Sequence, residues 1–73
     1  MKNARMFSFL RQSALADKEK SLMSLELLSE HPAGIGDHTT GDFYTNAEEA
    51  LSNLADAEDR LEMLERHFPG VGK

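Results

Sequence analysis

The chain of 73 residues contains no cysteine and no tryptophan. The first absence excludes disulfide bonds, which stabilise many proteins of this size. A chain of about 60 to 70 residues buries only about 60% of the surface that it exposes when unfolded, so its own core is small. Natural proteins of this length that lack disulfides usually add a metal ion or a partner chain. We expect a single domain whose stability depends on such a contribution.

The chain also lacks a long hydrophobic run, and it contains only two prolines. A transmembrane helix requires about 20 consecutive apolar residues, which no segment of this sequence supplies. The basic residues near the N-terminus are not followed by the apolar segment and cleavage site of a signal peptide. We expect a soluble, unprocessed protein with no membrane partner, and the absence of cysteine agrees with a reducing cytoplasm.

Basic residues are few and unevenly distributed. Residues 1–20 carry five basic and two acidic side chains, whereas residues 21–73 carry three basic and eleven acidic ones. The net charge of −5 repels phosphate groups, so we expect no nucleic-acid partner. We expect the basic first segment either to be a solvated surface or to contact the acidic second segment, in the same chain or in a neighbouring one.

A first helix is predicted from about residue 6 to residue 30. Its apolar residues recur at spacings of three, four and seven, as on one face of a helix, and good helix formers lie between them. Charged residues interrupt this face at residues 17–20, so the best-buried part is expected between Leu22 and Leu28. The predicted face consists of Phe7, Leu10, Ala14, Leu15, Leu22, Leu25 and Leu28.

A second helix is predicted from about residue 40 to residue 67. Its apolar residues alternate at spacings of three and four, which is typical of the heptad seam of packed helices. Thr45 and Glu48 have the spacing of a capping box, but a start near Thr40 is favoured because Phe43 continues the seam. Two acids that precede an arginine by four residues add intrahelical ion pairs. The seam consists of Phe43, Ala47, Ala50, Leu54, Ala57, Leu61, Leu64 and Phe68.

Residues 31–39 are predicted to form a loop that reverses the chain. Pro32 stops the first helix, because the residue before a proline disfavours the α conformation. Gly34 and Gly36 can adopt the positive φ angles that a reversal needs, and Ile35 between them is expected to cover the open end of the hairpin. The five aromatic residues lie near the chain ends and just after this loop, which predicts that they meet in space.

These elements predict an all-α protein, a two-helix antiparallel hairpin followed by a short tail at residues 68–73. Because a lone hairpin buries only one stripe of each helix, we expect it to form a dimeric four-helix bundle. The alternative is a coiled coil between second helices, in which Arg60 would face Glu65 across a parallel pair. The expected interface residues are Leu22, Leu25, Leu28, Leu54, Leu61, Leu64 and Phe68.

The loop region also contains the best candidates for metal ligands, because zinc binds histidine and carboxylate side chains. Their spacing matches no recognised ligand motif, so we favour structural roles such as helix capping and predict no metal. No serine or carboxylate pair has a spacing typical of nucleophilic or acid–base catalysis. We therefore predict a protein without a cofactor that is not an enzyme. The four candidate ligands are His31, Asp37, His38 and Asp42.

Two stretches of the sequence carry a resemblance to known proteins: HPAGIGDH at residues 31–38 and DAEDRLEMLERHF at residues 56–68. Through them, residues 20–68 resemble short, mostly uncharacterised proteins of large tailed phages that infect marine bacteria. The resemblance implies a phage accessory protein made in the cytoplasm of the bacterial host, and it assigns no site residues. We expect an adaptor or modulator that binds a host or phage protein; the alternative is a structural component of the virion or of its assembly.

Overall fold

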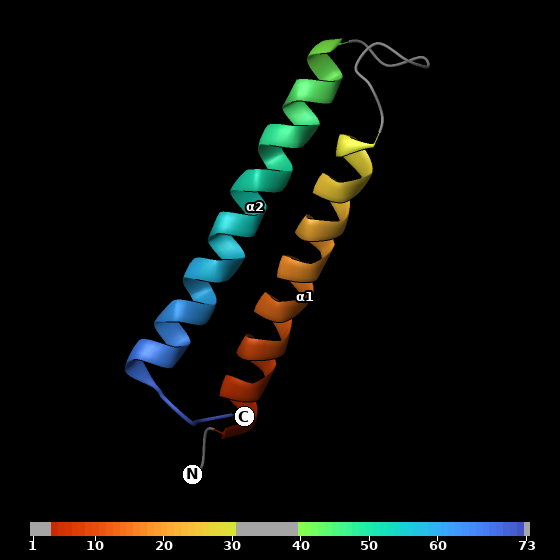
Figure 1. The fold of residues 1–73 in the computed structure, drawn as a ribbon. Helices are drawn as coiled ribbons and strands as arrows, with labels where there is room; N and C mark the ends of the chain where they lie inside the picture. The colour runs from red at the N-terminus through yellow and green to blue at the C-terminus, as the bar shows by residue number, and fades with distance from the viewer. Residues whose placement is uncertain (1–3, 31–39, 73) are drawn as a thin grey trace.

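The structure, a computed structural model, describes residues 4–30 and 40–72. It contains two α-helices, α1 (Ala4–Ser29) and α2 (Thr40–His67), and the described residues include no strand. The helices pack side by side and run in opposite directions (Figure 1). The Cα atoms extend over 52 × 16 × 14 Å, so the hairpin is a long and thin rod. The prediction of an all-α helical hairpin is confirmed.

The predicted helix boundaries agree closely with the observed ones. α2 has the predicted bounds, whereas α1 begins two residues before the predicted start and ends one residue before the predicted end. α2 begins at Thr40, as favoured over a capping box at Thr45. The acidic side chain in the first turn of α2 and the basic ones in its last turn suit the helix dipole. The predicted loop residues Pro32, Gly34, Ile35 and Gly36 lie outside the described residues.

The predicted seam of α2 is the face that packs on α1. Ala50 and Ala57 are buried, and the other seam residues are half-buried except for Phe68, which is 42% exposed. The regular three-and-four spacing places all of them on one side of the helix. The sequence prediction for this helix is therefore confirmed over its whole length.

The face that α1 presents to α2 agrees only in part with the predicted one, of which Phe7 and Ala14 are buried. Its buried residues are Phe7, Arg11, Ala14 and Ser21, which follow one another at spacings of four, three and seven. Leu10 and Leu15 lie beside this face and are 40% and 36% exposed. The best-buried part runs from residue 7 to residue 21, so the prediction that it lies between Leu22 and Leu28 is wrong. Arg11 and Ser21 therefore lie on the buried face of α1, where the apolar pattern predicted leucines.

Small residues form the centre of the contact between the helices. Ala14 and Ala57 are fully buried, and Ser21 and Ala50 are nearly so, while no large side chain of the described residues is fully buried. Short side chains allow two helix backbones to approach closely, because little volume separates them. The hairpin thus has a narrow core that leaves most of its leucines partly accessible.

The aromatic residues form two pairs at opposite ends of the rod. Phe7 and Phe68 stack with ring centroids 4.4 Å apart, next to the chain ends. Phe43 and Tyr44 contact each other edge to face at the other end, with centroids 5.6 Å apart. Phe9 is 67% exposed. The prediction that all five aromatics meet is therefore wrong, and only the pairing across the chain ends is observed.

The C-terminal residues fold back onto the beginning of α1. Phe68 ends the helix with a backbone hydrogen bond to Leu64, and Val71 N–H donates to the Phe68 carbonyl oxygen at 3.2 Å. The Val71 carbonyl in turn accepts a hydrogen bond of 3.0 Å from the Arg11 guanidinium. A Cβ atom at Gly72 would lie 2.5 Å from the backbone nitrogen of Ser8, so only glycine fits this close approach. The predicted tail is a turn that packs on α1.

Candidate protein-interaction surface

Ion pairs between the helices define two long faces of the hairpin. On one face, Lys18 pairs with Glu58, with Nζ and Oε2 3.8 Å apart. Arg11 and Glu65 pair on the same side at 3.8 Å. Of the two expected outcomes, a solvated basic surface or a contact with the acidic segment, these ion pairs show the second, within one chain. Because their side chains are partly solvated, such pairs mainly fix how the helices align.

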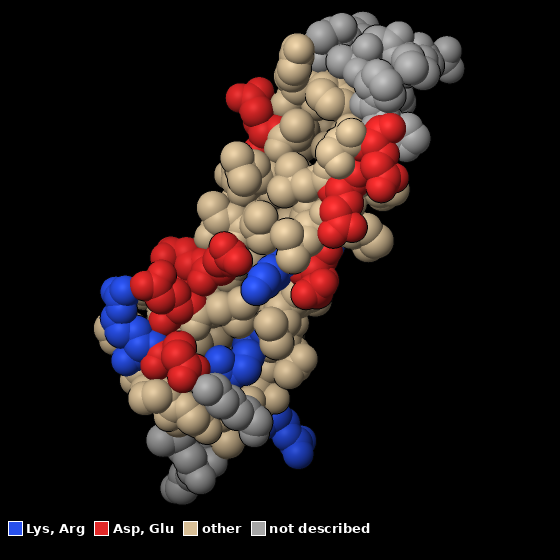
Figure 2. Space-filling model, viewed as in Figure 1, with Lys and Arg blue, Asp and Glu red and all other residues tan. Residues whose placement is uncertain are grey.

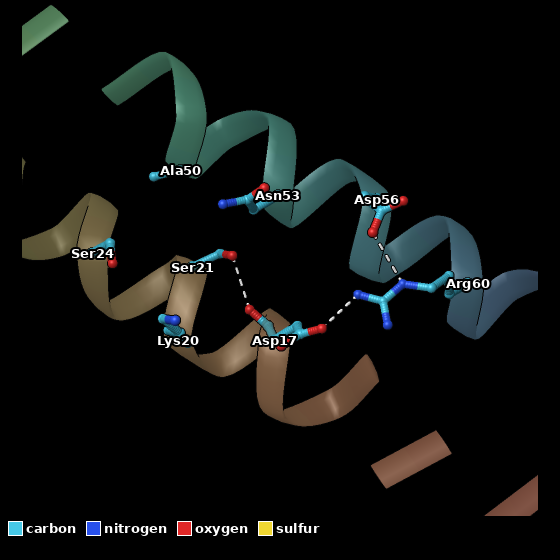
Figure 3. Close-up of a pocket in the computed structure, with 8 residues that line it drawn as sticks. All are labelled: Asp17, Lys20, Ser21, Ser24, Ala50, Asn53, Asp56 and Arg60. Carbon is cyan, nitrogen blue, oxygen red and sulfur yellow. Dashed lines mark hydrogen bonds and ion pairs between the residues drawn. The ribbon is translucent and has the colours of Figure 1, made fainter. Parts of the chain in front are cut away.

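The opposite face carries a triad of charged side chains, which Figure 3 shows. The Arg60 guanidinium donates hydrogen bonds to Asp17 of α1 at 2.7 Å and to Asp56, one turn earlier in α2, at 3.0 Å. The pKa of Arg60 is raised above its usual value, mainly by the hydrogen bond to Asp17. Desolvation lowers it by a smaller amount. An arginine is charged at physiological pH in any case, and the raised pKa reflects the contact that Asp17 makes with this charge.

A polar groove extends from this triad toward the loop end. It is bordered by serines of α1 and by an asparagine of α2, and Ser21 Oγ donates its hydrogen bond to the backbone carbonyl of Asp17 at 2.8 Å (Figure 3). The Asn53 side chain is exposed, whereas Ser24 is half-buried and Ser21 is buried. The middle part of this face is polar and can remain in contact with water. The lining residues are Asp17, Lys20, Ser21, Ser24, Ala50, Asn53, Asp56 and Arg60.

The face with the Lys18–Glu58 pair carries leucines from both helices. At about 100° per residue, Leu15 and Leu22 lie a quarter-turn from Ala14, on the side where Lys18 also lies. Leu51 and Leu54 lie on the side of α2 that carries Glu58. Leu51 is 60% exposed, Leu15 is 36% exposed and the other two are half-buried. We call the surface formed by Leu15, Leu22, Leu51 and Leu54 the leucine face.

These leucines lie at matching heights, by which we mean positions along the long axis of the hairpin. Leu22 follows Lys18 by one turn and Leu54 precedes Glu58 by one turn, and Lys18 contacts Glu58 directly. Since the helices are antiparallel, Leu22 and Leu54 are level with each other. Leu15 lies three residues before Lys18 and is level with Leu61 for the same reason. The leucine face therefore runs along both helices, with the Lys18–Glu58 pair between Leu15 and the level of Leu22 and Leu54.

Charge is distributed unevenly along the rod. In the view of Figure 2, the basic side chains gather in the half that contains the chain ends, and uncharged side chains form a broad area in the other half. Acidic side chains lie along both margins of that area (Figure 2). An uncharged centre with a charged rim is found in many protein interfaces, whose cores are depleted of charged residues.

A second, smaller apolar groove lies near the chain ends. Leu10 and Ser13 of α1 and Met63 and Leu64 of α2 line it, together with the charged residues that follow Glu58 in α2. Met6 and Phe9, 49% and 67% exposed, are close in sequence to this groove. The hairpin thus leaves apolar surface uncovered in more than one place.

The residues predicted to form an interface are partly used within the chain. Leu22, Leu25, Leu28, Leu54, Leu61 and Leu64 are half-buried, and Phe68 stacks on Phe7. Their contact with another chain stays a prediction. The coiled coil between second helices is not available through the predicted seam, because α1 covers it. Arg60, assigned to that coiled coil, pairs with Asp17 and Asp56 instead.

The most exposed members of the leucine face, Leu15 and Leu51, are absent from the predicted interface. The sequence prediction places Leu15 on the packing face of the first helix, and Leu51 is not one of the predicted seam residues of the second. The signal that could have found them is the spacing of seven residues between Leu15 and Leu22, and of three between Leu51 and Leu54. Both sets lie to one side of their helix's alanines, which is typical of a helix that packs against two neighbours.

Three of the candidate metal ligands, His31, Asp37 and His38, lie outside the described residues. Asp42 is exposed in the first turn of α2. Within the described ranges, no group of three or more histidine, aspartate or glutamate side chains is arranged to hold a metal ion. The prediction about metal binding at the loop therefore stays a prediction.

Comparison of the chain with protein-family models, with curated proteins and with solved structures gave no match. Neither α1 nor α2, the two helices that the structure describes, has an apolar stretch sufficient for a membrane crossing.

Proposed function

We propose that this protein acts by binding other proteins, without catalysis, and that self-association through the leucine face completes its fold as a dimeric four-helix bundle. The observation that supports this proposal is the exposure of large apolar side chains on a two-helix rod. Leu51 of the leucine face is 60% exposed, and Met23 and Leu27 on other sides of α1 are more than half exposed, while the buried apolar residues in the described part of the chain are one phenylalanine and three alanines. Large uncovered apolar patches mark interaction surfaces.

The cellular role that we propose is that of an adaptor or modulator that binds a host or phage protein in the bacterial cytoplasm. It rests on the resemblance of residues 31–38 and 56–68 to phage proteins and on the accessible apolar surface. A bundle formed by two hairpins would still expose the acidic outer side of α2 and the polar groove to a third protein. These surfaces suit a partner with basic and hydrogen-bonding groups.

A matched pair of variants tests the interaction surface. Leu51→Ser removes an apolar side chain from the leucine face, and Met23→Ser removes one of similar exposure, 57%, from the side of α1 opposite Ala14. We expect Leu51→Ser to shift the protein toward monomer in light scattering and Met23→Ser to leave the mass unchanged. Equal masses for the unmodified protein and both variants, with unchanged helicity, would contradict the role of the leucine face.

The second candidate is a structural component of the virion. The observation that favours it is the presence of two separate apolar areas, the leucine face and the groove lined by Leu10 and Met63. Two different surfaces that bind each other produce open assemblies rather than closed dimers. Mass spectrometry of purified virions separates the candidates, because many copies per particle would exclude a purely intracellular modulator.

A further inference from the structure

We infer that the leucine face is covered by the leucine face of a second copy, with the two-fold axis parallel to the long axis of the hairpin, so that α1 of each copy packs on α2 of the other. This inference deepens the proposed self-association by stating which surface pairs and in which orientation. It is carried by the heights of the leucines and by the difference in charge between the helices.

Two orientations bring one leucine face onto another. With a two-fold axis across the rod, α1 packs on α1 and α2 on α2, and the two rods run in opposite directions. With an axis along the rod, each α1 packs on the α2 of the other copy, and the heights of all residues are preserved. Both orientations are isologous, so both close into a dimer.

Charge separates the two orientations. α1 carries four basic and three acidic side chains, whereas α2 carries two basic and eight acidic ones. The axis across the rod would pack two strongly acidic helices against each other, which is unfavourable at low ionic strength. The axis along the rod packs each acidic helix against a helix with a slight basic excess. Charge complementarity therefore favours the second arrangement.

The heights of individual residues agree with this choice. Lys18 and Glu58 are level within one chain, so an axis along the rod also places Lys18 of one copy level with Glu58 of the other. Leu22 and Leu54, one turn further toward the loop end, become level across the interface in the same way. Leu22 and Leu54 of both copies then form one layer between the four helices, and the Lys18–Glu58 pairs form the next layer toward the chain ends. The bundle thus combines an apolar layer with ion pairs between helices, as packed helices often do.

Cross-linking of single-cysteine variants tests the orientation, and the chain suits it because it has no cysteine. We would prepare Leu22→Cys and nitrogen-15-labelled Leu51→Cys, refold them separately and as a mixture, and treat each with a short bis-maleimide. We expect cross-linked dimers mainly in the mixture, with one labelled and one unlabelled chain. Met23→Cys, whose side chain lies away from α2, serves as the matched control and should cross-link neither alone nor in mixtures.

The outcomes separate the inference from the proposed self-association. Efficient cross-linking of Leu51→Cys alone would indicate α2 on α2 and would overturn the orientation while leaving self-association intact. A dimeric mass without any cross-link to the leucine face would overturn the choice of surface. A monomeric mass for the unmodified protein would overturn both the inference and the proposed self-association.

A second measurement needs no substitution and so does not depend on whether the variants fold. In a dimer prepared from carbon-13-labelled and unlabelled chains, isotope-filtered NMR detects only contacts between copies. We expect contacts between methyl groups of Leu22 and those of Leu51 or Leu54. Contacts of Leu51 with Leu51 alone would contradict the inferred axis.

Discussion

In the half of the hairpin that holds the chain ends, Phe7 stacks on Phe68, Arg11 binds the Val71 carbonyl, and the cross-helix ion pairs named above hold the helices together. In the half next to the loop, Leu22, Leu25 and Leu28 of α1 are only half-buried. Both halves leave large apolar side chains accessible, such as Phe9 in the first half and Leu51 in the second. The comparison indicates that specific contacts within the chain fix the first half, whereas the second half packs mainly through partly exposed apolar side chains.

The largest expected effect comes from removing the aromatic contact at the chain ends. Phe7→Ala should lower the free energy of unfolding by about 3 kcal/mol, because it leaves a cavity beside Phe68. Phe9→Ala, at an exposed position, should change it by less than about 0.5 kcal/mol. In the other half, Leu28→Ala should cost about 1 kcal/mol, since less surface is buried there. Urea denaturation at a fixed protein concentration measures all three, and a larger cost at Leu28 than at Phe7 would reverse the comparison.

Overfilling the narrow contact between the helices should have the next largest effect. Ala14 is fully buried, so Ala14→Leu forces the helices apart at a cost of about 1–3 kcal/mol. Ala16→Leu, at an exposed position of the same helix, is the control and should be nearly neutral. Thermal unfolding followed by circular dichroism distinguishes the two. Equal melting temperatures would show that the backbones do not approach closely at Ala14.

The docking of the C-terminal turn can be tested through its two glycines. Gly70 and Gly72 both have positive φ angles, of 78° and 75°, but only Gly72 lies against the backbone of α1. Alanine at either position should cost about 1 kcal/mol from backbone strain. Gly72→Ala should in addition undock the turn and speed hydrogen exchange at the beginning of α1. Identical exchange rates in the two variants would contradict the close packing of Gly72.

The smallest expected effect concerns the cross-helix ion pair. Arg60→Met removes the bonds to Asp17 and Asp56, whereas Arg66→Met removes only the pair with Glu62 within α2. Partly solvated pairs contribute little to stability, so we expect a slightly larger loss for Arg60→Met than for Arg66→Met. The difference should shrink at high salt, where such pairs are screened. If the difference between the two variants is the same at low and high salt, the ion pair does not cause it, and the packing of the arginine stem does.

The two helices also differ in how far the sequence predicts them. The seam of α2 follows from its alternating spacing, because each seam position is occupied by an apolar residue. In α1 the same rule fails, since Arg11, Lys18 and Ser21 face α2 while Leu10 and Leu15 do not. Long basic side chains bury their stems and keep their charged ends in water, so polarity alone gives the wrong face. Ala14, Ala50 and Ala57 lie where the two backbones approach, whereas Ala16 and Ala55 are exposed.

The candidate surface and the C-terminal turn were predictable only in part. Composition and chain length predict that a two-helix protein needs a partner, but they do not choose between faces. The choice depends on which leucines α1 leaves exposed once Ala14 and Ser21 face α2. The contact of Gly72 with Ser8 has no signal in the local sequence, because it joins residues at opposite ends of the chain. Such contacts depend on the alignment of the helices, which the pairs of Arg11 and Lys18 fix.

Sedimentation equilibrium of the unmodified chain over a wide range of concentrations tests the central claim most directly. If accessible leucines on a two-helix rod require a second copy, the mass should approach twice the 8.1 kDa of one chain as concentration rises. A well-folded protein that keeps the mass of a single chain at every concentration would contradict the account.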